Sequence, residues 1–148
     1  SMEFHAASPE HYDLICHYQV TMAKETEDMT LDLETVKAGV QAVFDDPRKG
    51  EYYVASVDGK VIASLLLILE WSDWRNGSVM WVHSVYVDPS ARGQGIFPKM
   101  YASLQELGKD RGYYGVRLYV DKLNTKAQRV YTRLGMKNEH YDLYEQMF

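Results

Sequence analysis

The sequence has little cysteine, no zinc-like cluster of ligands and no long apolar run. Its single cysteine, Cys16, excludes a framework of intramolecular disulfides, and no group of Cys and His residues has zinc-site spacing. The longest apolar run, residues 61–69, contains Ser64 and is too short to cross a bilayer. No secretory signal precedes the first expected element. We therefore expect a cytoplasmic protein that binds no metal and does not enter a membrane.

Basic charge is also scarce. The chain has 16 Lys and Arg residues against 21 Asp and Glu residues, which gives a net charge of −5. Nucleic acid is not the expected partner, because phosphate backbones are bound by basic surfaces, whereas a cationic or small neutral substrate is compatible with this charge. The 148 residues are 46% apolar and 25% charged, as in ordinary globular proteins. We expect one domain over residues 2–148.

Apolar residues recur at the spacing of a strand in some segments of the sequence and at the spacing of a helix in others. Strands are expected near residues 4–7, 52–57, 61–69, 79–87, 116–120 and 141–148, and helices over residues 9–22, 33–44, 97–112 and 127–134. Ser8-Pro9 is a helix start, and Asp58-Gly59 is a two-residue hairpin signal. The order β-α-α-β-β-β-α-β-α-β predicts an α/β fold with a mixed sheet and helices on both faces.

The segment RGQGI, residues 92–96, lies between an expected strand and an expected helix. Glycines let a ligand approach the backbone, and free N–H groups at a helix start attract an anion. The segment is not a dinucleotide fingerprint, which has a third glycine where Pro98 stands, nor a P-loop, which continues Gly-Lys-Ser/Thr. It predicts either an anion site, to which Arg92 adds a charge, or a tight strand-to-helix turn with a surface arginine.

Together with two neighbouring segments, this loop resembles a known signature. Residues 85–89, VYVDP, precede it, and residues 124–136, NTKAQRVYTRLGM, follow it. Their order and spacing are similar to those of the GNAT superfamily of N-acetyltransferases, whose signature reads Gln/Arg-x-x-Gly-x-Gly/Ala. The expected element order agrees over essentially the whole chain. The resemblance implies a GNAT-like mixed sheet, acetyl-CoA as co-substrate, and acetyl transfer to a primary amine of a small molecule by direct attack in a ternary complex.

The resemblance also implies which residues hold acetyl-CoA. Its pyrophosphate would lie on the backbone N–H groups of residues 92–97, and its pantetheine arm would pair with the strand before the loop and contact Asn124. The implied set is Val85, Tyr86, Val87, Arg92, Gly93, Gln94, Gly95, Ile96, Phe97 and Asn124. An asparagine at position 124 also suits a helix N-cap. The sequence departs from the family at Phe97, where a small residue is usual, and at Pro98, which has no N–H. We expect the Phe97 side chain to pack in the core.

Two residues are candidates for proton transfer. In the family, a tyrosine that matches Tyr131 protonates the departing thiolate, although Tyr131 is alternatively a core aromatic. His83, with an ordinary pKa near 6.5, is the candidate base for the amine, and arylalkylamine members carry a histidine on the matching strand. The strand period of two predicts that His83 shares a face with Val85 and Val87. The alternatives are a histidine packed in the sheet, and Glu70 or a water chain as the base.

The acceptor pocket of the family lies between the first two helices and the central strands. In this sequence that region supplies Glu25, Glu70, Trp71 and Trp74. Carboxylates beside tryptophans would hold a small cationic or amphipathic amine by charge and cation–π contact. The alternatives are a solvated acidic run around Glu25 and structural packing of the two tryptophans.

Other functions compete with this one. The chain is alternatively a non-catalytic module that binds acyl-CoA, or an acetyltransferase that acts on protein amines. Cys16 lacks a recognisable activating set, so we expect no covalent acyl-enzyme. A homodimer is left open, since no specific sequence pattern indicates it.

Overall fold

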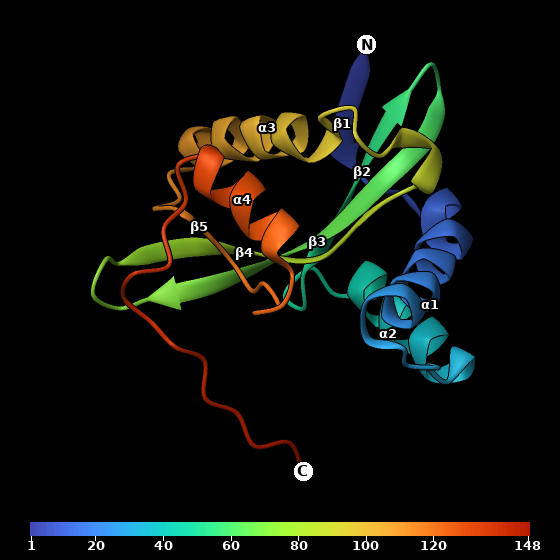
Figure 1. Ribbon diagram of the computed structural model, residues 1–148, viewed down its shortest axis with the longest axis horizontal. Coiled ribbons are helices and arrows are strands. Elements are labelled where there is room, and N and C mark those ends of the chain that lie inside the picture. The colour runs from blue at the N-terminus through green and yellow to red at the C-terminus, as the bar shows by residue number, and fades with distance from the viewer.

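Five strands build one mixed sheet, and four helices cover its two faces (Figure 1). The computed structural model describes residues 1–148. The elements are β1 Met2–Ala6, α1 Tyr12–Glu27, α2 Leu33–Asp45, β2 Glu51–Val57, β3 Lys60–Ser72, β4 Gly77–Val87, α3 Ile96–Arg111, β5 Val116–Leu118 and α4 Thr125–Arg133. Short 3₁₀ turns, Pro9–His11 and Pro89–Ala91, precede α1 and the glycine loop. The expected α/β fold with helices on both faces is confirmed.

The strands lie in the order β1-β2-β3-β4-β5. Neighbouring strands are antiparallel except β4 and β5, which are parallel because α3 carries the chain back along the sheet between them. The predicted hairpin between β2 and β3 is confirmed. Asp58 and Gly59 at its tip have φ angles of 51° and 79°, and the favoured two-residue turn requires such left-handed values.

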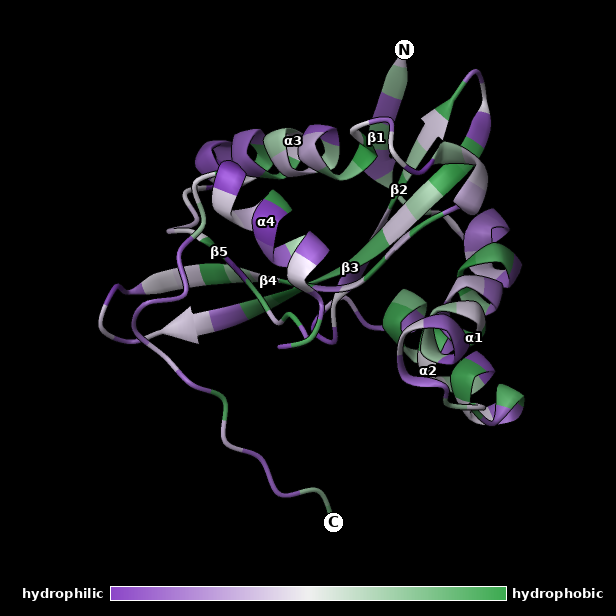
Figure 2. Cartoon of the chain, viewed as in Figure 1, coloured by the Kyte–Doolittle hydropathy of each residue, from purple (hydrophilic) through white to green (hydrophobic).

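Each face of the sheet has its own apolar core. On the α3 face the buried cluster includes Ala63, Leu65, Leu67, Met80, Val82, Ile96, Met100 and Leu104. On the opposite face, α1 and α2 cover a smaller cluster of Ile15, Cys16, Val40, Tyr52 and Val54. Figure 2 shows the apolar residues as green bands along β3 and β4. The larger core therefore lies under the helix that begins at the glycine loop.

The helix ends follow local chemistry. The Asp32 carboxylate accepts the Thr35 N–H at 3.0 Å and so caps α2, and α3 ends at Gly112, which has a left-handed φ of 76°. The four predicted helices are confirmed, since α1, α2, α3 and α4 overlap the ranges expected from apolar spacing. None of the helices combines the length and the apolarity needed to cross a bilayer.

The predicted strand over residues 141–148, called the tail from here on, is wrong. The Tyr141 ring still lies 5.8 Å from the guanidinium carbon of Arg117 in β5. The chain ends far from the sheet (Figure 1), and residues 137–148 are all exposed. A strand persists only where a neighbour pairs with its backbone N–H and C=O groups. The pattern of the tail is strand-like, but no strand of this chain pairs with it.

Truncation of a leucine tests the α3 core. Leu104 is 0% exposed, whereas Leu123, in the turn before α4, is 89% exposed. We expect Leu104→Ala to lower the free energy of unfolding by about 2–5 kcal/mol, because it removes buried surface and leaves a cavity. The matched Leu123→Ala should change it by less than about 0.5 kcal/mol. Urea denaturation measures both, and equal changes would contradict the assigned core.

Candidate active site

A β-bulge in β4 sets the geometry of the site. Leu66 of β3 lies opposite His83, and Ser64 lies opposite Tyr86, so one residue of β3 faces two residues of β4. Ser84, one of those two, has a left-handed φ of 53°. An extra residue of this kind bends the strand and shifts the alternation of its side chains.

The bulge overturns one prediction about His83. By strict alternation, His83, Val85 and Val87 would share a face of the sheet. Instead His83 lies opposite Leu66, on the face of α1 and α2, whereas Val85 and Val87 pack against the α3 core. The expected shared face is wrong because the extra residue inverts the period-two register after it.

The strands β4 and β5 part soon after they begin to pair. Residues 80–82 pair with residues 116–118, and the ladder ends there. Beyond this point, residues 83–87 bond to β3 along one edge only. The other edge exposes backbone N–H and C=O groups that a further strand or a ligand can satisfy.

Two adjoining cavities occupy the opening between these strands and α1. One, of about 370 Å³, is lined by α1, the α1–α2 loop, β4, β5 and α4, and has both His83 and Tyr131 on its wall. The other, of about 520 Å³, lies between α1 and β4 and reaches the glycine loop. The cavities share Met22, Thr26 and Val85, so they form one groove along β4.

A row of free backbone donors lies where α3 begins. Gly93 and Gly95 have left-handed φ angles of 76° and 71°, which residues with a side chain adopt only under strain. The N–H groups of residues 93–97 donate to no acceptor in the protein, and Pro98 has no N–H to offer. Unpaired N–H groups at a helix N-terminus favour an anion. The loop is therefore suited to a phosphate group.

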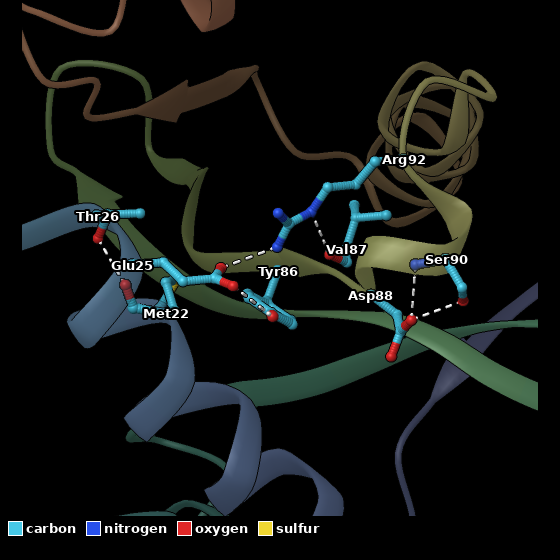
Figure 3. Close-up of polar contacts among 8 residues, drawn as sticks. All are labelled: Met22, Glu25, Thr26, Tyr86, Val87, Asp88, Ser90 and Arg92. Atoms are coloured by element: carbon cyan, nitrogen blue, oxygen red, sulfur yellow. Dashed lines mark hydrogen bonds and ion pairs between the residues drawn. The ribbon is translucent and has the colours of Figure 1, made fainter.

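Arg92 lies across the groove beside these donors (Figure 3). Its Nη2 donates to Glu25 Oε2 at 2.9 Å, and its Nε donates to the carbonyl oxygen of Val87 at 3.0 Å. Its guanidinium carbon lies 5.3 Å from the centre of the Tyr86 ring. The hydrogen bond to Glu25 raises the pKa of Arg92. A permanent cation thus occupies the free edge of β4 near Val87.

Tyr131 lies at the other end of the groove. Its ring meets the Phe97 ring edge-on, with centroids 5.5 Å apart, so the first turn of α3 supports it. Phe97 also stacks on Tyr101 at 6.2 Å, which gives its half-buried side chain a packing role. Burial raises the pKa of Tyr131, so its hydroxyl keeps its proton at neutral pH.

His83 lies among aromatic side chains. Its ring centroid is 6.1 Å from that of Trp81 and 5.8 Å from that of Tyr119, and the latter two rings are 4.6 Å apart. Burial lowers the pKa of His83 below its ordinary value of 6.5, so the ring is mainly neutral at pH 7. Trp81 and Tyr119 were not predicted from the sequence, although the strand period of two places Trp81 on the same face as His83.

Asn124 lies at the start of α4, where its side-chain oxygen accepts the Ala127 N–H at 3.1 Å. This is the N-cap role that the sequence allowed. The same cap fixes the start of the helix that carries Tyr131 two turns later.

The four residues predicted to bind the acceptor are not brought together. Glu70 pairs with Arg117 at 2.8 Å, and the exposed Trp71 and Trp74 lie at the far end of the β3–β4 hairpin. None of these three lines the groove. Glu25 does line it, at the end beside the glycine loop, where it holds Arg92.

Cys16 does not take part in the groove. It is buried in the core under α1 and α2, and burial raises the pKa of its thiol. A buried thiol with a raised pKa is a poor nucleophile. No three side chains of the types His, Cys, Asp and Glu gather as ligands for a metal.

The acetyltransferase (GNAT) family model matches residues 12–136. The chain belongs to the GNAT family of acetyltransferases. This finding confirms the resemblance drawn from the glycine loop, the strand before it and the helix that carries Tyr131.

Individual proteins agree with this family. The chain is similar to the crystal structure of a possible acetyltransferase from Clostridium difficile 630, with 39% identity and a TM-score of 0.91, over 99% of this chain and 97% of that chain. It is 38% identical over 92 residues to a mycothiol acetyltransferase of Actinosynnema mirum, and this match covers 62% of this chain and 30% of that protein. It is 32% identical over 78 residues to the thialysine N-epsilon-acetyltransferase of Bos taurus, and this match covers 53% of this chain and 45% of that protein. The matched segments thus span less than half of these two curated relatives.

A pair of glycine substitutions tests the strained loop. A Cβ at Gly95 would meet no atom within 4 Å, so Gly95→Ala acts through its left-handed backbone and should cost about 1–2 kcal/mol of stability. Gly39 inside α2 also has open space, but its backbone is helical, so Gly39→Ala should stabilise by about 0.5–1 kcal/mol. Thermal denaturation should show melting temperatures that move in opposite directions. A rise for both variants would contradict the strained loop.

Proposed function

We propose that the chain is an acetyl-CoA-dependent N-acetyltransferase that acts on a primary amine of a small molecule. The observation that carries the proposal is one continuous groove along β4 that reaches free backbone donors at one end and has the half-buried side chains of His83 and Tyr131 on its wall at the other. The first end suits the pyrophosphate of coenzyme A, and the second suits acyl transfer. Membership of the GNAT family supports the same reading.

Acetyl-CoA fits the donor set of the groove. The N–H groups of residues 93–97 and the Arg92 guanidinium offer charge-compatible donors to its pyrophosphate. The free edge of β4 at residues 85–87 offers backbone groups to the amides of its pantetheine arm. Arg92 Nε donates to the Val87 carbonyl oxygen. When an amide N–H of the pantetheine arm donates to that oxygen, it replaces the Arg92 bond. Asn124 is positioned by its cap, and we propose that its amide nitrogen meets the same arm.

Two residues move protons in the proposed reaction. The neutral imidazole of His83 accepts the proton that the ammonium of the acceptor must lose before its nitrogen can attack. The hydroxyl of Tyr131 donates a proton to the departing sulfur. Acetyl-CoA, when bound, supplies the activated acetyl group. The buried and unreactive Cys16 supports direct attack rather than a covalent acyl-enzyme.

The walls of the groove favour an amphipathic amine. Met22, Met29, Leu31 and Tyr119 offer apolar surface, and Glu27 adds a carboxylate. The side-chain nitrogen of Gln19, on the same wall, is buried and has no hydrogen-bond partner, so it is free to donate to the acceptor. The bovine relative is named for transfer to the ε-nitrogen of thialysine, which supports a small amine as acceptor.

Tyr131→Phe tests the proposed activity. We expect turnover, measured as release of free CoA over a panel of small amines, to fall about 10²–10⁴-fold, because the general acid is lost. The rise in melting temperature that acetyl-CoA causes should stay, since the phenol is not part of the phosphate site. Tyr101→Phe is the matched control, because Tyr101 also packs on Phe97 but does not line the groove, and it should keep wild-type turnover.

Each outcome of this experiment decides between functions. If acetyl-CoA does not raise the melting temperature of the wild type, the proposed function is wrong. Stabilisation without turnover on any amine indicates a binding module instead. Turnover of the wild type that Tyr131→Phe leaves unchanged removes the assigned role of Tyr131.

His83→Gln tests the base through the dependence of turnover on pH. Burial lowers the pKa of His83, so its basic form is present at pH 7 and is lost as the pH falls through a value below 6.5. The wild type should therefore show an acidic limb below pH 6.5 that His83→Gln lacks, together with lower turnover at pH 7. His17→Gln, at an exposed position on α1, is the control and should keep the wild-type profile. An unaltered acidic limb in His83→Gln would rule out His83 as the base.

A further inference from the structure

The cavity with His83 and Tyr131 on its wall carries negative charge and no fixed positive charge. Glu27 is the only Asp or Glu that lines it, and no Lys or Arg does. Burial lowers the pKa of His83, so its ring is mainly neutral at pH 7 and does not balance the carboxylate. A ligand that fills this cavity therefore meets a net negative wall.

The carboxylate of Glu27 is the free one among three at the end of α1. Glu25 pairs with Arg92 at 2.9 Å, and Asp28 pairs with Lys24 at 2.7 Å. Glu27 forms neither an ion pair nor a side-chain hydrogen bond within the protein, although it lines the cavity. Its charge is thus available to a cation of the ligand.

The end of α1 adds acceptors of the same polarity. Gln19, Ala23 and Glu27 follow one another at a spacing of four, so they share one face of the helix, and all three line the cavity. α1 ends at Glu27, and the carbonyl oxygens of residues 25–27 accept no hydrogen bond from the protein. The last carbonyls of a helix form the negative end of its dipole and favour a cation. The backbone and the Glu27 side chain therefore select the same sign of charge.

Most of the remaining wall is apolar. Besides the polar groups, the cavity is lined by aliphatic and methionine side chains, which are Met22, Met29, Leu31, Val82 and Leu118. This surface favours a hydrocarbon chain, because its burial removes apolar area from water. The cavity thus suits a molecule with a short hydrocarbon chain and a cation at the end that does not react.

We propose that the acceptor is a diamine and that Glu27 is the residue that selects it, an inference that rests on the proposed acetyl transfer. One nitrogen gives its proton to His83 and forms the amide bond while the C–S bond of acetyl-CoA breaks, and the sulfur takes a proton from Tyr131. The second nitrogen keeps its proton and remains an ammonium group beside Glu27. The product carries one acetyl group and one positive charge.

The same wall disfavours an acceptor whose far end is only a carboxylate. Such a group would lie near the like charge of Glu27 with no cation to pair with. Arg92 lines the adjoining cavity and is bonded to Glu25, and Arg117 is bonded to Glu70 and lines neither cavity. An unpaired like charge discriminates against a ligand as effectively as a good contact favours one.

A matched set of acceptors tests the diamine. Putrescine has an amine at each end of its chain, butylamine lacks the second amine, and γ-aminobutyrate has a carboxylate in its place. We expect kcat/KM, measured as release of free CoA, to be about tenfold or more higher for putrescine than for butylamine, because a hydrogen bond between charged groups is lost. γ-Aminobutyrate should be poorer still. Cadaverine and hexanediamine, each beside its monoamine, extend the set to longer chains. Equal values for diamines and monoamines at every length would overturn the proposal.

Glu27→Gln tests the selecting residue. It should raise KM for putrescine about tenfold with little change in kcat, and the preference for putrescine over butylamine should disappear, because the ammonium loses its counter-charge. Glu27→Lys should invert the preference and favour γ-aminobutyrate over putrescine. A preference for the diamine that survives Glu27→Gln would overturn the role of Glu27.

Asp28→Asn is the matched control at the same helix end. Asp28 does not line the cavity, and asparagine tolerates its left-handed φ of 52°. The variant removes one negative charge next to Glu27, yet it should keep the preference of the wild type for putrescine. Loss of the preference in Asp28→Asn would show that the general charge of this surface, rather than Glu27, selects the acceptor, and would overturn the assignment.

Calorimetry separates this inference from the proposed function. Putrescine and butylamine are titrated into the wild type and into Glu27→Gln, with and without CoA. The wild type should bind putrescine about tenfold more tightly than butylamine, and Glu27→Gln should bind the two alike. Preferential binding without turnover supports the diamine site and contradicts acetyl transfer. Turnover of amines with no preference in binding or in kcat/KM supports acetyl transfer and overturns the diamine site.

Discussion

The early separation of β4 from β5 is the constraint on which the groove depends. The parallel ladder stops after three residue pairs, next to the bulge at Ser84. A bulge increases local bend and twist, so β4 continues along β3 while β5 leads away to α4. The result is a free strand edge with α1 on one side and α4 on the other. Without that separation, β4 would bond on both edges and no space would exist between His83 and Tyr131.

The electrostatics of the groove begin with the backbone. The chain as a whole is acidic, yet five consecutive N–H groups and Arg92 create a local site for an anion. Charges far from this site are screened within about 8–10 Å at physiological ionic strength, so net charge does not decide what binds there. Glu25 is the one carboxylate that bonds directly to Arg92. It fixes the guanidinium on the groove wall, against Tyr86 and the edge of β4.

Desolvation acts on both proton-transfer groups in the direction that the proposed chemistry needs. Burial disfavours the charged form of any side chain, so it lowers the pKa of His83 and raises that of Tyr131. One cavity thereby holds a neutral imidazole and a protonated phenol at the same pH. Phe97 contributes to this environment, because its ring covers one side of Tyr131. The residue that departs from the family signature thus packs against the proposed general acid.

Local patterns were enough to predict the helices, the Asp58-Gly59 hairpin and the glycine loop, because caps, turns and apolar spacing act within a few residues. They were not enough for the bulge at Ser84, whose register depends on β3, or for the contact between Glu25 and Arg92, which are 67 residues apart. They also predicted a strand at residues 141–148 that has no partner in this chain. The sequence by itself determined the family, the order of the elements as far as α4 and the glycine loop before α3. Only the tertiary structure decided which side chains share the groove and which strand edges stay open, because both depend on contacts between segments distant in sequence.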